Sequence, residues 1–351
     1  MTRPARLALL VVVLGVVTAA PAGAAAVCPG FGPVREVGHV AADLTEISGV
    51  AASRTHPGVW WVHDDSGGEP AVTAIGDAGE DLGTYSLPGA EAFDWEDIAA
   101  FDGQLYLADI GDNGRQRKDP RIFRAAEPAA VPSGAGGTLT GVTAIHLAYP
   151  DGPVDAEALV VDPRTGDLFV LTKEVGFSRV FRAPAATLVD GAHVTLEEVA
   201  RFDVPSPRSD VLYLPGVLVT GADVSPDGST VLVRTYRSVL AFTRPAGKPL
   251  AAAFATAPCE VPQAEEDQGE AVGWSADGRA YVTLSEGSHV AVHRVERRAA
   301  ATTTTGATRP TGSSSIWPLA GLLAVVVALA VVVASRRGRA GRPRTRASRR
   351  P

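Results

Sequence analysis

The stretch "DWEDIAAFDGQLYLADIGDN" (residues 94–113) sets the pattern from which the fold is predicted. It begins with a short acidic segment, the lead to the first strand, and continues with an apolar run, a Gly-containing turn, a second apolar run and a polar loop. Four more segments follow the same order: "EISGVAASRTHPGVWWVHDDSG" from 46, "DAEALVVDPRTGDLFVLTKEVG" from 155, "TGADVSPDGSTVLVRTYRS" from 220 and "QGEAVGWSADGRAYVTLSEGS" from 268. This recurrence indicates a repeat architecture built from β-hairpins.

Further apolar runs after the hairpins supply a third and a fourth strand. Third strands are expected at "RIFRAA" (from 121), "RVFRAP" (179), "VLAFTR" (239) and "VAVHRV" (290). Fourth strands are expected at "DLGTYSLP" (81), "VTAIHLAYP" (142), "VTLEEVARFDVP" (194) and "PLAAAFATAP" (249). Four short antiparallel strands per repeat are typical of a propeller blade, so the sequence predicts an all-β, five-bladed β-propeller over residues 27–298. A sixth blade within residues 206–218 is the alternative.

The ring of blades needs a closing strand, and the sequence offers one. The fifth repeat has no fourth strand, whereas "PVREVGHV" (33–40) is left over at the N-terminal end. We expect this segment to close the ring as the outer strand of the last blade. The two cysteines, Cys28 and Cys259, would then join the closing strand to the preceding blade by a disulfide. Two buried free thiols are the alternative.

Both ends of the sequence carry signals for export and membrane insertion. Residues 1–26 combine a basic head, an apolar run and a small-residue cleavage site, as in a secretory signal peptide. A lipoprotein anchor at Cys28 is the alternative, but Val27 stands where the lipobox requires Gly, Ala or Ser. Residues 299–315 form a Thr/Ser/Gly/Pro linker, and residues 316–335 are predicted as one transmembrane helix because their apolar run can cross a bilayer.

The charge distribution predicts how the chain is oriented. The tail, residues 336–351, holds eight arginines and no acid, which predicts a cytoplasmic tail on a single-pass cell-membrane protein whose propeller is extracellular. Nucleic-acid binding by the tail is the alternative, although its juxtamembrane position favours lipid contact. Of 32 Lys and Arg residues, two lie in residues 1–26 and eight in the tail, which leaves 22 against 39 acidic residues. This acidic balance argues against nucleic acid and for bound cations or solubility.

Aligning the first strands of the five hairpins brings one position of each into register. These positions are Ser48, Glu96, Glu157, Ala222 and Glu270. The first strand of a propeller blade lines the central channel, so three carboxylates would converge and repel one another unless they protonate or hold a cation. An oxygen-only ligand set, with Ala222 contributing its backbone carbonyl, favours Ca²⁺ or another hard cation over zinc. The alternative is that the glutamates bond backbone amides and water in a plugged channel.

This arrangement resembles the calcium-activated nucleotidases, or apyrases, five-bladed propellers in which Ser, Glu, Glu, Ser and Glu surround a central calcium. The matching stretches are "EISG", "DWED", "DAEA", "VTGAD" and "QGEA", with Ala222 as a departure, and "WWVHDDSG" is similar to the first-blade Asp pair of that family. The resemblance implies a central calcium and an activity on phosphorylated metabolites. A weaker likeness is to phytase-like and lactonase-like secreted propellers.

Polar loops after the second strands are expected on the same face as the leads to the first strands. They carry three candidate catalytic acids, Asp64, Asp65 and Asp109. They also carry nine candidate ligand-binding residues: His63, Asp112, Asn113, Lys173, Glu174, Arg234, Tyr236, Arg237 and Glu286. The favoured function is a surface module that binds a protein or glycan. The alternative is a calcium-dependent hydrolase of a small anionic metabolite, in which Lys173, Arg234 and Arg237 hold the anion and one of the three acids transfers the proton.

Overall fold

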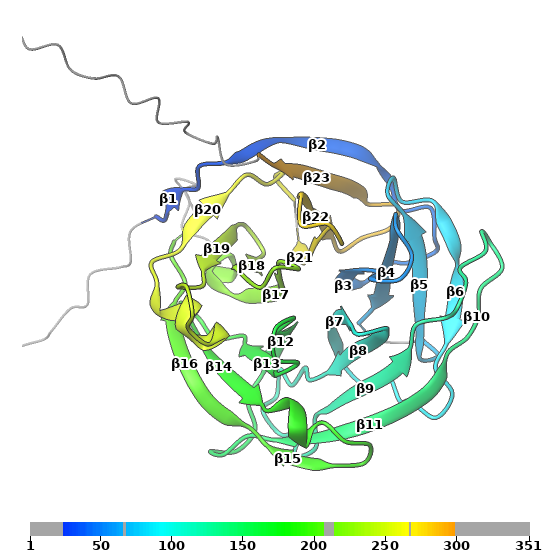
Figure 1. The fold of residues 1–351 in the computed structure, drawn as a ribbon, viewed down its shortest axis with the longest axis horizontal. Helices are drawn as coiled ribbons and strands as arrows, with labels where there is room; N and C mark the ends of the chain where they lie inside the picture. Colours follow the sequence, from blue (N-terminus) through cyan, green and yellow to red (C-terminus); the bar gives the residue numbers. More distant parts are fainter. Residues whose placement is uncertain (1–23, 66–67, 207–213, 267, 299–351) are drawn as a thin grey trace, which may run out of the picture. The chain divides into compact units, whose positions relative to one another are not determined.

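The computed structural model describes residues 24–65, 68–206, 214–266 and 268–298, and these form five β-sheets around a central axis (Figure 1). All of the described residues belong to one compact unit. The prediction of an all-β, five-bladed propeller is confirmed. Within the described ranges there is no further sheet that could serve as a sixth blade.

The strands of each blade follow one another from the axis outward. Blade 1 contains β3 (Ile47–Ala52), β4 (Val59–Asp64), β5 (Ala71–Gly76) and β6 (Asp81–Ser86). Blade 2 contains β7 (Trp95–Phe101), β8 (Gln104–Asp109), β9 (Arg121–Ala126) and β11 (Thr140–Ala148). Blade 3 contains β12 (Ala156–Val161), β13 (Leu168–Thr172), β14 (Phe177–Ala183) and β16 (Glu197–Asp203).

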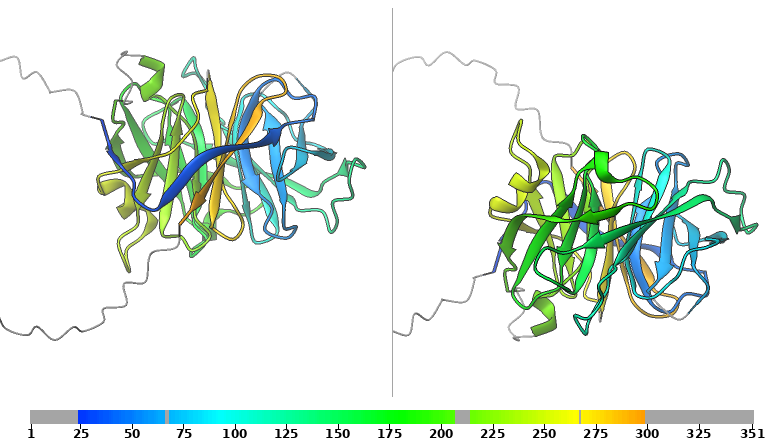
Figure 2. Two further views of the ribbon diagram at one scale, coloured as in Figure 1. Left: turned by 90° about the horizontal axis from the view of Figure 1, so that it is seen from above. Right: turned by 90° about the horizontal axis from the view of Figure 1, so that it is seen from below.

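The last two blades have the same order, although the fifth takes its outer strand from the start of the chain. Blade 4 contains β17 (Val219–Val224), β18 (Thr230–Thr235), β19 (Val239–Thr243) and β20 (Cys259–Val261). Blade 5 contains β21 (Gly269–Trp274), β22 (Ala280–Ser285), β23 (Ala291–Arg297) and β2 (Phe31–His39). Figures 1 and 2 show β2, in dark blue, along the outside of the ring beside β23. The expected closure is therefore confirmed.

Short parallel strands cover the outer edges of three blades. β1 (Ala26–Val27) pairs with β20, β10 (Gly137–Thr138) with β6, and β15 (His193–Thr195) with β11. An edge strand presents unpaired backbone groups, and these additions satisfy some of them. Each addition also ties one blade to a neighbouring connection.

A disulfide reinforces the closure of the ring, as predicted. Cys28 directly follows β1 and is bonded to Cys259 at the start of β20, with Cα atoms 5.0 Å apart. Cys28 lies in the short segment between β1 and β2, and Cys259 lies in blade 4. The cross-link therefore holds the beginning of the closing strand against blade 4.

The segment "PLAAAFATAP" is not the fourth strand of blade 4. It contains a 3-10 helix, η3 (Leu250–Ala255), and β20 provides the outer strand instead. Leu250, Ala253 and Phe254 are its buried residues, a spacing of three and four that fits a helical turn. Between its prolines the segment has only one β-branched residue, Thr256, and five alanines, so little in it favours a strand. The other 3-10 turns are η1 (Ala185–Thr187) and η2 (Leu214–Val217).

The hydrophobic core lies between neighbouring blades. Every residue of β3, β12 and β21 is buried, which fits their mostly apolar sequence, and each strand carries one buried polar residue: Ser48, Glu157 or Glu270. Trp61 of blade 1 and Trp95 of blade 2 share one cluster, while Phe202, Phe242 and Phe254 join blades 3 and 4. Packing between the sheets fixes the inner strands around the axis.

The export and anchoring signals fall almost entirely outside the described residues. Of the predicted signal peptide only residues 24–26 are described, and Ala26 belongs to β1. The predicted linker, membrane helix and tail, residues 299–351, are not described. Among the described helices, none has the length and apolar character needed to cross a membrane.

Candidate functional site

Each inner strand is interrupted by a one-residue β-bulge at the same place. In blade 1, for example, Ile47 pairs with Asp64 and Gly49 with His63, so Ser48 has no partner across the ladder. The residues bypassed in this way are Ser48, Glu96, Glu157, Thr220 and Glu270. All five are buried. Bulges recur where a strand has to redirect a side chain, and here they place one polar residue per blade at equivalent positions.

The structure corrects the fourth member of this ring. The bulge of β17 falls at Thr220, whereas Ala222 pairs regularly with Val233 and donates its N–H to Asp97 Oδ2 at 3.2 Å. The predicted alignment of Ala222 with the other four residues is therefore wrong. Thr220 restores a hydroxyl at the position where the sequence comparison found none. A usable signal was present, because Thr220 and Ser48 both directly precede a glycine.

A polar cavity of about 250 Å³ opens where these strands begin. It brings together nine predicted site residues, namely Ser48, Asp65, Glu96, Asn113, Glu157, Lys173, Tyr236, Glu270 and Glu286. Sequence reasoning missed three lining residues: Glu46, Ile47 and Asp94. Glu46 and Asp94 each lie two residues before a ring residue, so the two-residue period of a strand could have identified them.

The cavity is strongly acidic. Its lining contains seven carboxyl groups, from Glu46, Asp65, Asp94, Glu96, Glu157, Glu270 and Glu286, and one cation, Lys173. Lys173 Nζ lies 2.5 Å from Glu157 Oε1 and 5.5 Å from the centre of the Tyr236 ring. Burial lowers the pKa of Lys173, but the Glu157 carboxylate outweighs this effect and the pKa is raised. The lysine is therefore held in its charged form by the ring.

The ring glutamates hold protons more tightly than free carboxyl groups do. Burial, together with the charges of Glu157 and Asp94, raises the pKa of Glu96 well above its usual value. Burial raises the pKa of Glu157 to about 7 against the opposing effect of Lys173, and burial with the nearby Glu157 raises that of Glu270 to about 9. At neutral pH, Glu270 is therefore largely protonated, and Lys173 balances the charge of Glu157.

One carboxyl oxygen of the ring is left over. Glu270 Oε2 is buried and has no hydrogen-bond partner among the described residues. An unpaired buried polar atom is unfavourable, and such atoms often indicate a missing ligand. The hydroxyls of Ser48 and Thr220 donate to backbone carbonyls, Ser48 to Glu96 O at 2.7 Å and Thr220 to Gly269 O at 2.9 Å. Each hydroxyl oxygen keeps lone pairs that can accept or coordinate.

Two other acids hold the inner strands together. Asp97 accepts the N–H groups of Ile98 in its own strand, Leu159 in β12 and Ala222 in β17, at 2.8, 2.9 and 3.2 Å. Asp223 accepts the N–H of Trp274 in β21 at 2.7 Å. These carboxylates cross between blades and explain part of the acidic character of the first strands.

Two of the three candidate catalytic acids also have structural partners. Asp64 Oδ1 accepts the Glu46 N–H at 3.0 Å, which fixes the lead into β3. Asp109 accepts the Asp94 N–H at 3.0 Å and forms an ion pair with Arg117 at 2.8 Å. Neither lines the cavity, whereas Asp65 does. Of the three acids, only Asp65 is therefore placed to reach a ligand there.

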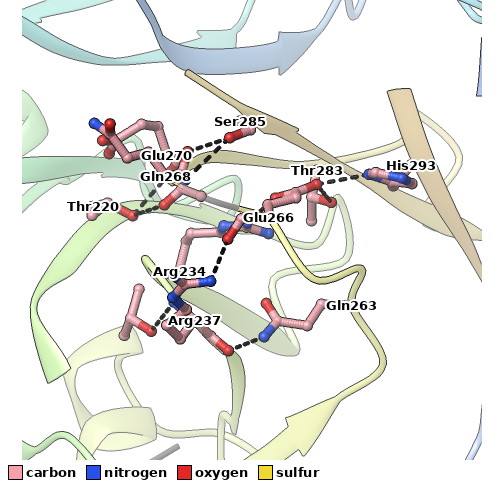
Figure 3. A network of polar contacts seen from close by, with 12 residues as sticks. Thr220, Arg234, Arg237, Gln263, Glu266, Gln268, Glu270, Thr283, Ser285 and His293 are labelled. Atoms are coloured by element: carbon pink, nitrogen blue, oxygen red, sulfur yellow. Dashed lines mark hydrogen bonds and ion pairs between the residues drawn. The ribbon is translucent and has the colours of Figure 1, made fainter. Parts of the chain in front are cut away.

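The predicted anion-binding arginines lie behind the ring instead of at its mouth. Arg234 is within β18, has no exposed surface and forms an ion pair with Glu266, which also accepts from His293 Nδ1 at 2.7 Å (Figure 3). Arg237 Nη1 donates to the Glu266 backbone carbonyl at 2.8 Å. A Cβ on Gly269 would collide with the Arg234 guanidinium, so glycine makes room for the buried cation.

The remaining predicted ligand-binding residues also have roles away from the cavity. His63 is buried, burial lowers its pKa to about 4, and its ring packs edge-on against Trp95. Asp112 accepts the Arg117 N–H at 2.7 Å, and Glu174 forms an ion pair with Arg179 at 3.0 Å. None of these three predicted residues lines the cavity.

No protein-family model matches the sequence, and no curated protein matches it either. The structure shows a five-bladed propeller with an acidic axial cavity. The resemblance to calcium-activated nucleotidases accordingly rests on the five-bladed fold and on short motifs of the first strands and of "WWVHDDSG".

Proposed function

We propose that the axial cavity binds a hard divalent cation, Ca²⁺ in the first place, and that the propeller is a cation-dependent ligand-binding module on the cell surface. The observation that carries the proposal is the convergence of Glu96, Glu157 and Glu270 on one buried cavity, with Glu270 Oε2 unpaired within the described structure. A divalent cation would relieve the repulsion among these carboxylates and supply the missing partner.

The donor atoms suit calcium better than a transition metal. The cavity offers carboxylate oxygens from three glutamates and the hydroxyl oxygen of Ser48, whereas Thr220 is at the equivalent bulge but does not line the cavity. Calcium accepts six to eight oxygen ligands at variable geometry, and water can complete such a shell. No histidine or cysteine is among the residues described as lining the cavity, and these are the ligands that zinc prefers.

Lys173 would compete with the divalent cation for the Glu157 carboxylate. Protonation of Glu270 and the Lys173–Glu157 ion pair reduce the repulsion in the ring without metal, and the pKa of Glu96 is raised in the same direction. Calcium binding would have to release protons from the glutamates and move the ammonium group away from Glu157. Binding is therefore expected to depend on pH, and Lys173 would become available at the cavity mouth when the ion binds.

The composition of the cavity favours binding over hydrolysis of an anion. A phosphorylated metabolite would face seven carboxyl groups, and Lys173 is the only cation among the described lining residues. Arg234 and Arg237, which were expected to hold the anion, are engaged with Glu266. Hydrolysis would need the metal to hold the substrate, so the hydrolase alternative depends on the same cation site. The surface location rests on the export and anchoring signals of the sequence.

Calorimetric titration of the chelator-treated protein with Ca²⁺ tests the proposal. We expect one ion per chain and at least a tenfold loss of affinity in Glu270→Gln, which removes a ligand charge but keeps the shape of the side chain. Glu36→Gln is the matched control, because Glu36 is an exposed residue of β2 and should leave binding unchanged. Absence of Ca²⁺ binding to the wild-type protein, or equal affinity in Glu270→Gln, would contradict the proposal.

A further inference from the structure

Three side chains of the types that ligate metals, Asp119, His146 and His193, lie on the outer edge of blade 2, remote from the axis. There β15, part of the connection between β14 and β16 of blade 3, pairs in parallel with β11 (Figure 1). His146 of β11 and His193 of β15 are register partners in this pairing. Their imidazole rings stack with centroids 4.4 Å apart and planes inclined by 15°.

A carboxylate completes the group. Asp119 Oδ1 lies 2.8 Å from His146 Nδ1, and one ligand atom from each of Asp119, His146 and His193 lies within 4.8 Å of the others. His193 is exposed, and the side chains of His146 and Asp119 are 25% and 46% exposed, so an ion can enter from solvent. The three residues come from two blades and are brought together only by the β11–β15 pairing.

We propose that Asp119, His146 and His193 bind a zinc-class transition-metal ion. Two imidazole nitrogens and one carboxylate oxygen are a ligand set that Zn²⁺ accepts, and a water molecule can take the fourth tetrahedral position. Tetrahedral ligands around zinc are separated by about 3.3 Å, which small rotations of these side chains can reach. The nitrogen ligands distinguish this rim site from the oxygen-only axial cavity.

A supporting shell orients the carboxylate. Arg121 Nε donates to Asp119 Oδ2 at 3.2 Å, and Arg121 Nη1 donates to Glu91 Oε2 at 2.7 Å. This leaves Asp119 Oδ1 directed at the histidines. Asp119 and Glu91 carry two negative charges against the one positive charge of Arg121. When both imidazoles are neutral, these five side chains therefore have a net charge of −1. Metal-binding carboxylates are commonly held by such second contacts.

The expected consequence is mechanical. β15 is only three residues long and reaches blade 2 from the connection of blade 3. A metal ion shared by Asp119, His146 and His193 would fasten this connection to the edge of blade 2. Binding of the ion should therefore also stabilise the pairing of β11 with β15.

The protein contains a matched control for this site. His39 and His289 also stack, with centroids 5.0 Å apart and planes inclined by 15°, and Glu36 lies 3.9 Å from His39. This pair does not bring three ligand atoms within 4.8 Å in the described structure. His289→Gln therefore removes a stacked histidine without touching the proposed site.

The test uses Co²⁺ and Zn²⁺ with the purified protein in excess Ca²⁺, which occupies hard-cation sites. We expect one Co²⁺ per chain with the visible absorption of a tetrahedral site, displaced by Zn²⁺. His193→Gln and Asp119→Asn should each lose this spectrum and weaken Zn²⁺ binding at least tenfold, whereas His289→Gln should match the wild type.

Hydrogen exchange supplies a second readout. Zn²⁺ should slow exchange of the β15 amides in the wild type and in His289→Gln, but not in His193→Gln, whose exposed position leaves folding intact. The proposal is overturned if His193→Gln keeps the wild-type spectrum and affinity, or if the wild type gives no tetrahedral Co²⁺ spectrum. These outcomes do not depend on whether the axial cavity binds calcium.

Discussion

The ring glutamates work against folding when they ionise without a partner. The folded-state pKa values of Glu157 and Glu270, about 7 and about 9, lie above the usual value of 4.5. A group with a raised folded pKa contributes its full stability below its ordinary pKa and loses it as pH rises through the folded value. The chelator-treated protein should therefore have a melting temperature that falls between pH 5 and pH 9.

Calcium should reverse this trend, because the bound ion favours the ionised carboxylates. We expect the difference in melting temperature between Ca²⁺ and chelator to grow from pH 5 to pH 9, as protons compete less with the ion. Melting curves across this range in both buffers give the measurement. A difference that is absent, or that shrinks as pH rises, would mean that the ring does not hold the ion.

Asp97 is expected to matter for stability and not for binding. Its carboxylate accepts three backbone N–H groups from three inner strands, so Asp97→Ala leaves buried donors unpaired. We predict a loss of about 3 kcal/mol or more in the free energy of unfolding, since each unsatisfied buried group costs about 1–3 kcal/mol. Urea denaturation measures it. Asp203→Ala, at an exposed position of β16, is the control and should change stability little.

At the scale of the strand, Arg234 is a fully buried charge whose role is structural, because it is paired with Glu266. Removing this arginine takes away the cation paired with buried Glu266, which then keeps only its contacts with Thr283 and His293. Arg234→Ala should therefore lower the free energy of unfolding by about 3–5 kcal/mol. Thermal or urea denaturation decides the point, with Lys118→Ala at an exposed site as the control. If Arg234→Ala folds as stably as the wild type, the ion pair has no structural role.

Strand periodicity and turn residues were enough to predict most elements. The strand left over at the N-terminal end predicted the closure, and the even number of cysteines in an exported chain predicted the disulfide. The errors have local physical causes. The sequence alignment placed the ring position of β17 two residues too late, because the bulge of this strand falls at Thr220 and not at Ala222. The segment with η3 was assigned as a strand from its place in the repeat, although its alanines and flanking prolines favour a turn.

The candidate site was predictable only in part, for a related reason. Sequence places Lys173 and Arg234 near the ends of second strands. It does not show that Lys173 reaches Glu157 while Arg234 turns toward Glu266, 32 residues away. The partner that decides whether a charge is exposed comes from a distant part of the chain. Glu46 and Asp94 were missed because only one position per strand was considered.

At the scale of the whole propeller, the disulfide and the closing strand hold the ring shut. Cys28 and Cys259 are 231 residues apart, so the cross-link restricts a long stretch of unfolded chain. We expect Cys28→Ser with Cys259→Ser to lower the free energy of unfolding by about 2–5 kcal/mol. Comparison of oxidised wild type, reduced wild type and the double variant by urea denaturation tests this. Equal stability of all three would show that β2 closes the ring unaided.

The account as a whole depends on an ion at the axis, and a crystal structure grown in Ca²⁺ and measured at a wavelength with calcium anomalous signal would test it directly. We predict one anomalous peak in the axial cavity, about 2.3–2.6 Å from carboxylate oxygens of Glu96, Glu157 and Glu270, with Lys173 withdrawn from Glu157. An axis without such a peak, with Lys173 still bound to Glu157, would contradict the proposed cation site.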